Sequence, residues 1–80
     1  MIGFEEAFIY GKWLFGNKFK RATDTSDGWL SFLDKDDESL GEEQTWDEFE
    51  WEWKRLMEKN DSFRKFVESE RKSKALKRKR

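Results

Sequence analysis

The sequence contains neither cysteine nor histidine. Without cysteine it can form no disulfide, and without both residue types it lacks the usual ligands of structural zinc. The histidine-activated serine or cysteine nucleophile of many hydrolytic enzymes is excluded for the same reason. We therefore expect a protein that is not an enzyme and carries no metal or other cofactor. The absence of cysteine also fits a reducing compartment.

Long apolar runs are missing as well. No segment approaches the length of a membrane span, and the first residues lack the basic-then-apolar order of a signal peptide. The sequence thus predicts a cytoplasmic protein. Its 80 residues suffice for one small domain, which buries only about 60 to 65% of the surface that the unfolded chain exposes. With disulfides and zinc excluded, additional stability has to come from oligomerisation or from a partner.

Aromatic side chains and charge are abundant. Phe, Trp and Tyr total fourteen residues, against nine for Leu, Ile and Val. Each ring buries about 150 to 250 Å², so a small interior needs few of them, and some Trp should remain at the surface as binding anchors. The net charge is +2 over residues 1–23, −10 over residues 24–61 and +7 over residues 62–80. These blocks indicate ends with different electrostatic roles or, equally well, a solvated face and a frayed tail.

The first expected element is a helix over residues 4–15, because apolar residues recur there at i, i+3, i+4 and i+7. Acidic residues in its first turn suit the helix dipole, and Gly16 offers a left-handed stop. Ile9 and Trp13 fall off the apolar stripe, so we expect them to form a face for self-association into a homo-oligomer. The stripe itself, which should face the core, consists of Phe4, Ala7, Phe8, Gly11, Leu14 and Phe15.

The next segments predict a β-hairpin followed by a loop. Residues 18–23 and 28–34 are short and are joined by turn-forming residues, although 28–34 also fits a short helix. Residues 34–44 are acidic and predict an exposed loop. Asp34, Asp36 and Glu38 imitate the first half of a calcium loop, but Ser39 stands where Gly is needed and Thr45 where the bidentate Glu is needed. We expect no metal site there.

The C-terminal half predicts a long or broken helix from residue 46 to about residue 70. Thr45 and Glu48 match a capping box, and residues 60–62 offer a second N-cap. The alternation of aromatic and charged residues over 48–54 also fits a half-buried strand. The expected fold class is therefore α+β, with a single domain over residues 1–70, and an all-α fold is the alternative. Residues 71–80 form a basic tail that should be disordered when alone.

The acidic middle block predicts the function. Carboxylates beside Trp residues compose a surface that can dock on a basic groove, with rings as anchors and carboxylates as steering charges. On a helix, rows of carboxylates can imitate DNA phosphates, so we expect an inhibitor or regulator of a basic nucleic-acid-binding protein. Small phage-encoded inhibitors are similar in size and composition. The expected contact residues are Trp46, Asp47, Glu48, Glu50, Trp51, Glu52 and Trp53.

The basic C-terminal residues support an alternative function. Clustered Lys and Arg can neutralise phosphates, so the chain could bind nucleic acid directly. The residues expected to do so are Arg71, Lys72, Lys74, Lys77, Arg78, Lys79 and Arg80.

A third function follows from a resemblance. The order GFEEA, a Gly-bearing helix end, KFKR and DGWLSFLD over residues 3–34 resembles the helix-hairpin start of small phage proteins of the Thoeris anti-defence type. That family implies an oligomeric sponge for a cyclic nucleotide signal. The basic-Gly-Trp-Asn-Gly stretch of the family has no counterpart after Arg21, so the resemblance assigns no ligand residues.

Overall fold

The computed structural model describes residues 2–25 and 27–78, and the side chains only as far as residue 73. The elements in chain order are α1 (Phe4–Phe15), the 3₁₀ turn η1 (Gly16–Lys18), β1 (Arg21–Asp24), β2 (Trp29–Leu33), β3 (Gln44–Thr45), α2 (Trp46–Lys59) and α3 (Asp61–Arg78). This α+β arrangement confirms the expected fold class and excludes the all-helical alternative.

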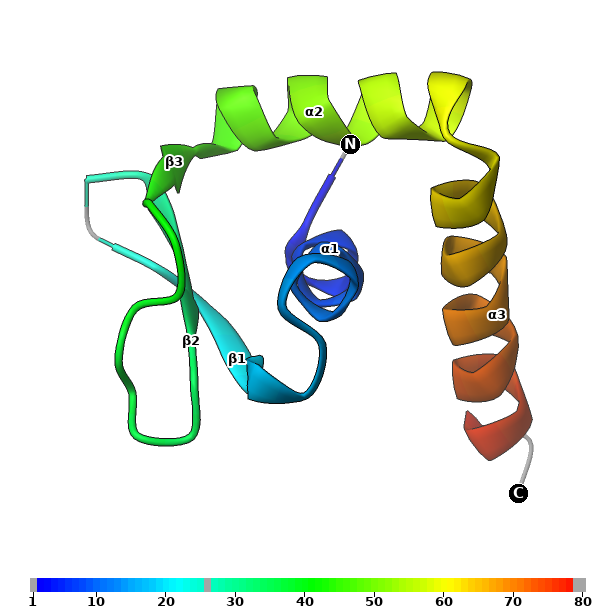
Figure 1. Ribbon diagram of the computed structural model, residues 1–80, viewed down its shortest axis with the longest axis horizontal. Coiled ribbons are helices and arrows are strands. Elements are labelled where there is room, and N and C mark those ends of the chain that lie inside the picture. The colour runs from blue at the N-terminus through cyan, green and yellow to red at the C-terminus, as the bar shows by residue number, and fades with distance from the viewer. Residues whose placement is uncertain (1, 26, 79–80) are drawn as a thin grey trace.

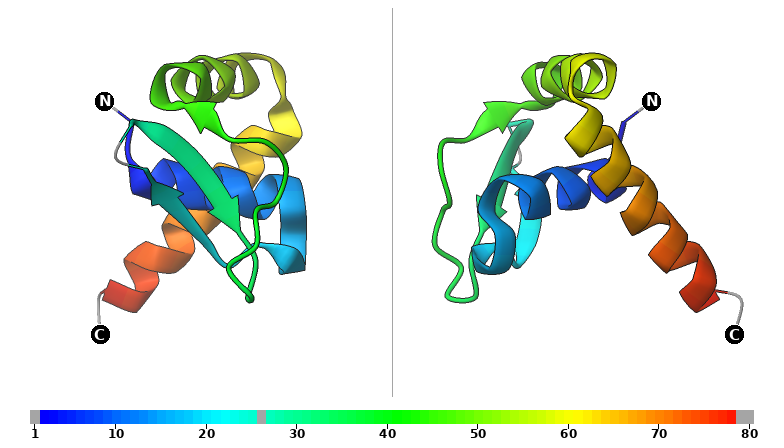
Figure 2. Two further views of the ribbon diagram at one scale, coloured as in Figure 1. Left: turned by 90° about the vertical axis from the view of Figure 1, so that its left-hand side faces the viewer. Right: turned by 45° about the vertical axis from the view of Figure 1, so that its right-hand side comes forward.

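Helix α1 lies at the centre of the molecule (Figure 1). The sheet covers one side of it and α3 the other, while α2 crosses above and contacts both the sheet and α3. Figure 2 shows the same arrangement from two further directions, with α1 behind the sheet in the left view. The chain therefore encloses its own central helix on several sides.

Helix α1 begins and ends where the local chemistry predicts. The Glu6 carboxylate accepts a hydrogen bond from the Gly3 N–H at 2.8 Å, which satisfies a donor that precedes the first turn. Gly16 ends the helix with a φ of 58°, a conformation that glycine adopts without steric cost. Both boundaries match the predicted range of 4–15.

The predicted hairpin is present and belongs to a three-stranded antiparallel sheet in the order β1-β2-β3. Strands β1 and β2 pair from Arg21 opposite Leu33 to Asp24 opposite Leu30. The short helix considered for residues 28–34 is thus wrong. Strand β3 was not predicted, because its two residues pair with Trp29 and Leu30 and carry no periodic pattern of their own.

The acidic segment before β3 is an exposed turn that keeps contact with the sheet. The Leu40 N–H donates to the Phe32 carbonyl at 2.7 Å, which holds the returning chain beside β2. The Asp34 carboxylate accepts from the backbone N–H groups of Asp36 and Glu38 at 2.9 and 3.0 Å, so it stabilises the turn itself. In the part of the chain that is described, no group of acidic side chains is placed to hold a metal ion.

Residues 46–59 form helix α2, so the strand considered for 48–54 is wrong. The capping box predicted from the sequence is complete: Thr45 Oγ1 accepts from the Glu48 N–H at 3.1 Å, and the Glu48 carboxylate accepts from the Thr45 N–H at 3.0 Å. These bonds satisfy helix-end donors, which strand pairing would not require. The N-terminal cap thus decides between the two periodicities.

The predicted break after residue 59 is a corner between α2 and α3. Asn60 Oδ1 accepts from the Phe63 N–H at 3.0 Å and caps α3. Arg64 reaches back and donates to the last carbonyls of α2, at 2.9 Å to Met57 and 3.1 Å to Glu58. Helix α3 continues to Arg78 rather than ending near residue 70. The basic segment thus begins inside a helix, while residues 79 and 80 lie outside the described residues.

The core is largely aromatic, as the composition predicts, but it meets a different face of α1. Ile9 is 3% exposed, whereas Phe4 and Leu14 of the expected stripe are 47 and 49% exposed. Because α1 is apolar around most of its circumference, periodicity alone does not identify its inward side. The fully or nearly enclosed apolar residues are Ala7, Ile9, Tyr10, Phe19, Leu30, Phe32, Phe49, Trp53, Phe63 and Val67.

The expected self-association face through Ile9 and Trp13 is wrong. Ile9 is buried, and Trp13 packs against Phe63 and Phe66 of α3 with ring centroids 5.4 and 5.6 Å apart. Helix α3 of the same chain therefore covers the side of α1 that was expected to meet a second copy. Ion pairs from Lys12 to Glu70 and from Arg71 to Glu6, at 2.8 and 3.3 Å, join the same two helices.

Across the residues that the structure describes, none of the helices combines the length and the apolar character needed to cross a membrane.

Candidate functional site: an acidic aromatic cleft

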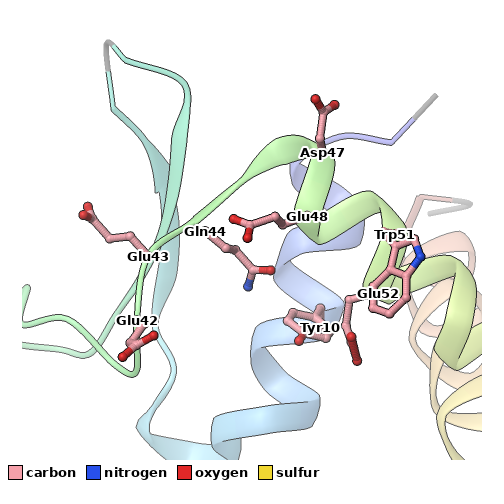
Figure 3. A pocket seen from close by; sticks show the side chains of 8 residues that line it. All are labelled: Tyr10, Glu42, Glu43, Gln44, Asp47, Glu48, Trp51 and Glu52. Atoms are coloured by element: carbon pink, nitrogen blue, oxygen red, sulfur yellow. The ribbon is translucent and has the colours of Figure 1, made fainter.

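A cleft of about 590 Å³ opens between β3, α2 and α1. Figure 3 shows its lining: Tyr10 and the Gln44 amide at the floor, Glu52 beside Tyr10, and the Trp51 ring on the α2 side. The strand side carries carboxylates, and Asp47 points outward at the rim. The complete lining is Tyr10, Glu42, Glu43, Gln44, Asp47, Glu48, Trp51 and Glu52.

Helical spacing explains why α2 presents these side chains together. Asp47 and Trp51 are four residues apart, as are Glu48 and Glu52, so the two pairs lie on one face of the helix. The capping box fixes the start of α2 directly after β3, which places this face beside Glu42 and Glu43 of the preceding chain. Five carboxylates from two segments therefore gather around one opening.

The carboxylates differ in how firmly the chain holds them. Glu43 accepts a hydrogen bond from the buried Ser31 hydroxyl at 2.6 Å, and Glu52 accepts one from Arg55 at 2.6 Å. Glu48 is engaged in the cap of α2. Within the described chain, the carboxylates of Glu42 and Asp47 have neither a hydrogen-bond nor an ion-pair partner. These two are free to meet a cation from another molecule.

The cleft floor is neutral. Burial raises the pKa of the Tyr10 hydroxyl, and the negative charge of Glu52 raises it further, while Gln44 and Arg55 act in the opposite direction. Tyr10 therefore stays protonated at neutral pH, because even its ordinary pKa is about 10. Its hydroxyl can donate or accept a hydrogen bond beneath the carboxylates.

None of the eight residues that line the cleft is cationic. A second hollow, of about 620 Å³, lies between η1 and the turn after β2 and has a mixed lining that includes Lys18, Lys20 and Lys35 beside Asp34, Asp36 and Glu38. Charges of both signs offset each other there. A lining whose charges are all negative attracts a cationic ligand, so the first cleft is the better candidate site.

The structure brings together four of the seven predicted contact residues: Asp47, Glu48, Trp51 and Glu52. Trp51 is 64% exposed, which confirms the expectation that some Trp remain at the surface. The sequence did not identify Tyr10, Glu42, Glu43 or Gln44 as site residues. The two Glu were visible only as part of a charged loop, and no local pattern links Tyr10 to residues more than thirty positions away.

Three predicted contact residues do not reach the cleft. Trp53 is 8% exposed and stacks edge-on against Phe63 with centroids 5.2 Å apart, so it is a core residue. Trp46 is half-buried and packs against Phe4 at 5.2 Å. Glu50 pairs with Lys54 at 3.3 Å, on a different side of α2. Helical geometry turns these three residues away from Asp47 and Trp51, so they do not belong to the predicted contact surface.

The basic residues proposed for nucleic-acid contact lie along the C-terminal part of α3. Arg71 is already engaged, with its guanidinium 3.3 Å from Glu6 and 5.9 Å from the centre of the Trp53 ring. Lys72 is exposed. The side chains of Lys74, Lys77 and Arg78, and Lys79 and Arg80 altogether, lie outside the described residues.

Comparison with family models, with curated proteins and with solved structures finds no match to this chain.

Proposed function

We propose that this protein is a small protein-binding inhibitor or regulator, which acts in the cytoplasm by docking its acidic aromatic cleft on a basic, nucleic-acid-binding target protein. The observation that carries the proposal is the cleft lining, which contains five carboxylates and an exposed Trp but no cation. Such a surface supports steering by charge and anchoring by an aromatic ring, which are the two components of many protein interfaces.

The cleft supports an inhibitory role because its charges would compete with nucleic acid for the same cations. A Lys or Arg that contacts a phosphate can form charge-assisted hydrogen bonds to a carboxylate as well. Glu42 and Asp47 have no partner within the described chain, so meeting such a cation breaks no ion pair there. A target held in this way would lose its nucleic-acid contacts while the inhibitor remains bound.

A charge-removing variant tests the proposal. We expect the variant carrying Glu42→Gln and Asp47→Asn to bind a short peptide of alternating arginine and glycine about 3- to 10-fold more weakly at low ionic strength, with a smaller difference in high salt. The matched control is the variant carrying Asp24→Asn and Glu68→Gln, which removes the same charge from exposed positions outside the cleft lining. Isothermal titration of the full chain measures both affinities.

The same peptide allows a direct test of inhibition. The protein should release the peptide from a fluorescently labelled DNA duplex, and the cleft variant should do so less well than the control variant. If both variants bound the peptide equally weakly, only net charge would matter, and the assignment of binding to the cleft would be wrong. If the native chain did not bind the peptide at low salt, the proposed function would be wrong.

Direct nucleic-acid binding through the basic end of α3 is a second candidate. It is favoured by the continuation of α3 to Arg78, which carries the basic segment away from the body of the molecule (Figure 1). Clustered cations along a helix can neutralise several phosphates of a nucleic-acid backbone. This candidate uses the opposite end of the molecule from the cleft.

Removal of residues 71–80 tests the second candidate. We expect the truncated chain to lose a salt-sensitive gel shift with duplex DNA or RNA, because phosphate neutralisation supplies most non-specific affinity. Truncation also removes the ion pair between Arg71 and Glu6, so a full-length variant carrying Lys72→Gln, Lys74→Gln and Lys77→Gln is tested beside it and should weaken the shift without that loss. No shift of the native chain at low salt would dismiss this candidate.

A further inference from the structure

Trp51 separates two hollows on the surface of α2. One is the acidic aromatic cleft, and the other is a smaller depression of about 270 Å³ lined by Trp51, Lys54, Arg55, Glu58 and Lys59. The ring contributes to both linings, whereas Arg55 contributes only to the smaller one. The Trp51 side chain therefore forms a shared wall, with the cations of α2 on one side and the carboxylates of the cleft on the other.

In the smaller hollow, the Trp51 ring already carries a guanidinium. The central carbon of the Arg55 guanidinium lies 5.4 Å from the centre of the Trp51 ring, and Nη2 of the same group donates to the Glu52 carboxylate at 2.6 Å. Arg55 thus combines stacking on an aromatic ring with a charged hydrogen bond. The chain itself shows that this ring and a neighbouring carboxylate accommodate a guanidinium together.

The cleft side of Trp51 offers a similar combination with no internal cation. Asp47 stands one helical turn before Trp51, as Arg55 stands one turn after it, and the Asp47 carboxylate is exposed. In the described part of the chain nothing pairs with that carboxylate. A guanidinium at the rim of the cleft would have the Trp51 ring to stack on and the Asp47 carboxylate one helical turn away.

An arginine suits this position better than a lysine. Its guanidinium is planar and weakly hydrated, so it can stack on a ring while its edge donates to a carboxylate. A lysine ammonium is compact and strongly hydrated, and it gains mainly from the general negative charge of the cleft. Carboxylates by themselves favour arginine through paired hydrogen bonds, and stacking on the Trp51 ring adds a further preference for arginine.

We propose that the cleft face of Trp51, together with Asp47, is an arginine-binding subsite, so that the cleft recognises its partner through an arginine side chain. The inference rests on the proposed function and narrows it, because it names the chemical group that the partner must present. Arg55 is a positioning residue in this scheme, since its guanidinium packs on the Trp51 ring in the smaller hollow, and Glu52 holds that guanidinium in place.

Two peptides of equal length and charge test the subsite, one alternating arginine with glycine and the other lysine with glycine. The native chain should bind the arginine peptide about 3- to 10-fold more tightly, which is the range expected of a stacked cation at a partly exposed site. Trp51→Leu should reduce the difference by weakening the arginine peptide more than the lysine peptide. Trp51→Phe should retain part of the difference, because it keeps an aromatic face.

Circular dichroism provides the control for folding, and little loss is expected because the Trp51 side chain is mostly exposed. Equal binding of the two peptides by the native chain would overturn the arginine subsite and leave the proposed function standing. An arginine preference that is undiminished in Trp51→Leu would overturn it as well. Absence of binding to either peptide would instead count against the proposed function on which the subsite depends.

Discussion

Replacing Phe63 by Ala should lower the free energy of unfolding by about 3–5 kcal/mol, the range observed when a buried Phe is truncated. The Phe63 ring is fully buried where all three helices meet, with ring centroids 5.4 Å from Trp13, 5.2 Å from Trp53 and 6.5 Å from Tyr10. A cavity there would deprive each neighbour of contacts that no nearby group can restore.

This loss is large for so short a chain, whose total stability should be roughly 4–12 kcal/mol at the usual value per residue. Urea unfolding followed by tryptophan fluorescence measures the change. Phe4→Ala is the matched control, because the same ring is removed from a position that is half exposed. A loss at Phe63 no greater than the loss at Phe4 would contradict the packing of the three helices around Phe63.

Replacing Gly11 by Ala should lower the free energy of unfolding by about 1–3 kcal/mol, although Ala is normally the better helix former by about 1 kcal/mol. A methyl group at position 11 would lie only 2.7 Å from Cδ1 and Cζ of the Phe19 ring. That ring cannot easily move, because it is buried between Phe8 and Phe32 at centroid distances of 5.1 and 5.9 Å. Steric overlap therefore outweighs helix propensity.

A double-mutant cycle with Phe19→Leu isolates the cause. If the clash with the ring is responsible, Gly11→Ala should cost less in the Phe19→Leu background than in the native chain, since a smaller side chain leaves room for the methyl group. Thermal unfolding of the four proteins gives the coupling. An increase in stability on Gly11→Ala alone would show that α1 does not approach Phe19 as closely as the structure places it.

The distribution of the Trp residues bears directly on the proposed function. Trp53 is enclosed and Trp13 and Trp46 are half-buried, so most of the indole surface stabilises the fold. Trp51 and Trp29 remain exposed, at 64 and 40%. Ion pairs join the first charge block to the third and the middle block to both, and the middle block also supplies the carboxylates of the cleft.

Several local features could be read from the sequence without the structure. The bounds of α1, the capping box at Thr45 and the break at Asn60 all lie where they were predicted. Each depends on hydrogen bonds or backbone conformations within a few residues, so the information is contained in the segment itself. The hairpin between residues 18 and 34 belongs to the same class, because its turn and its pairing partners are adjacent in the chain.

The inward face of α1 depended on tertiary structure. The stripe that contains Phe4 and Leu14 is as apolar as the side that contains Ile9 and Trp13, and only the placement of α3 against the latter determined which side is buried. The same holds for Trp53, which the sequence suggested as a contact residue and which the corner at Asn60 brings against Phe63. Which face of a helix is buried depends on the element that packs against it. Apolar periodicity indicates only that some element does so.

The sequence by itself therefore determined the bounds of α1, the capping box of α2 and the acidic character of the middle block, and it favoured the hairpin and the α+β class, because these follow from local hydrogen bonding and composition. Only the tertiary structure decided which carboxylates share an opening. It placed Glu42 and Glu43 beside one face of α2 and brought Tyr10 beneath them from a helix more than thirty residues earlier. A cleft between segments distant in sequence is created by packing, which no short-range pattern encodes.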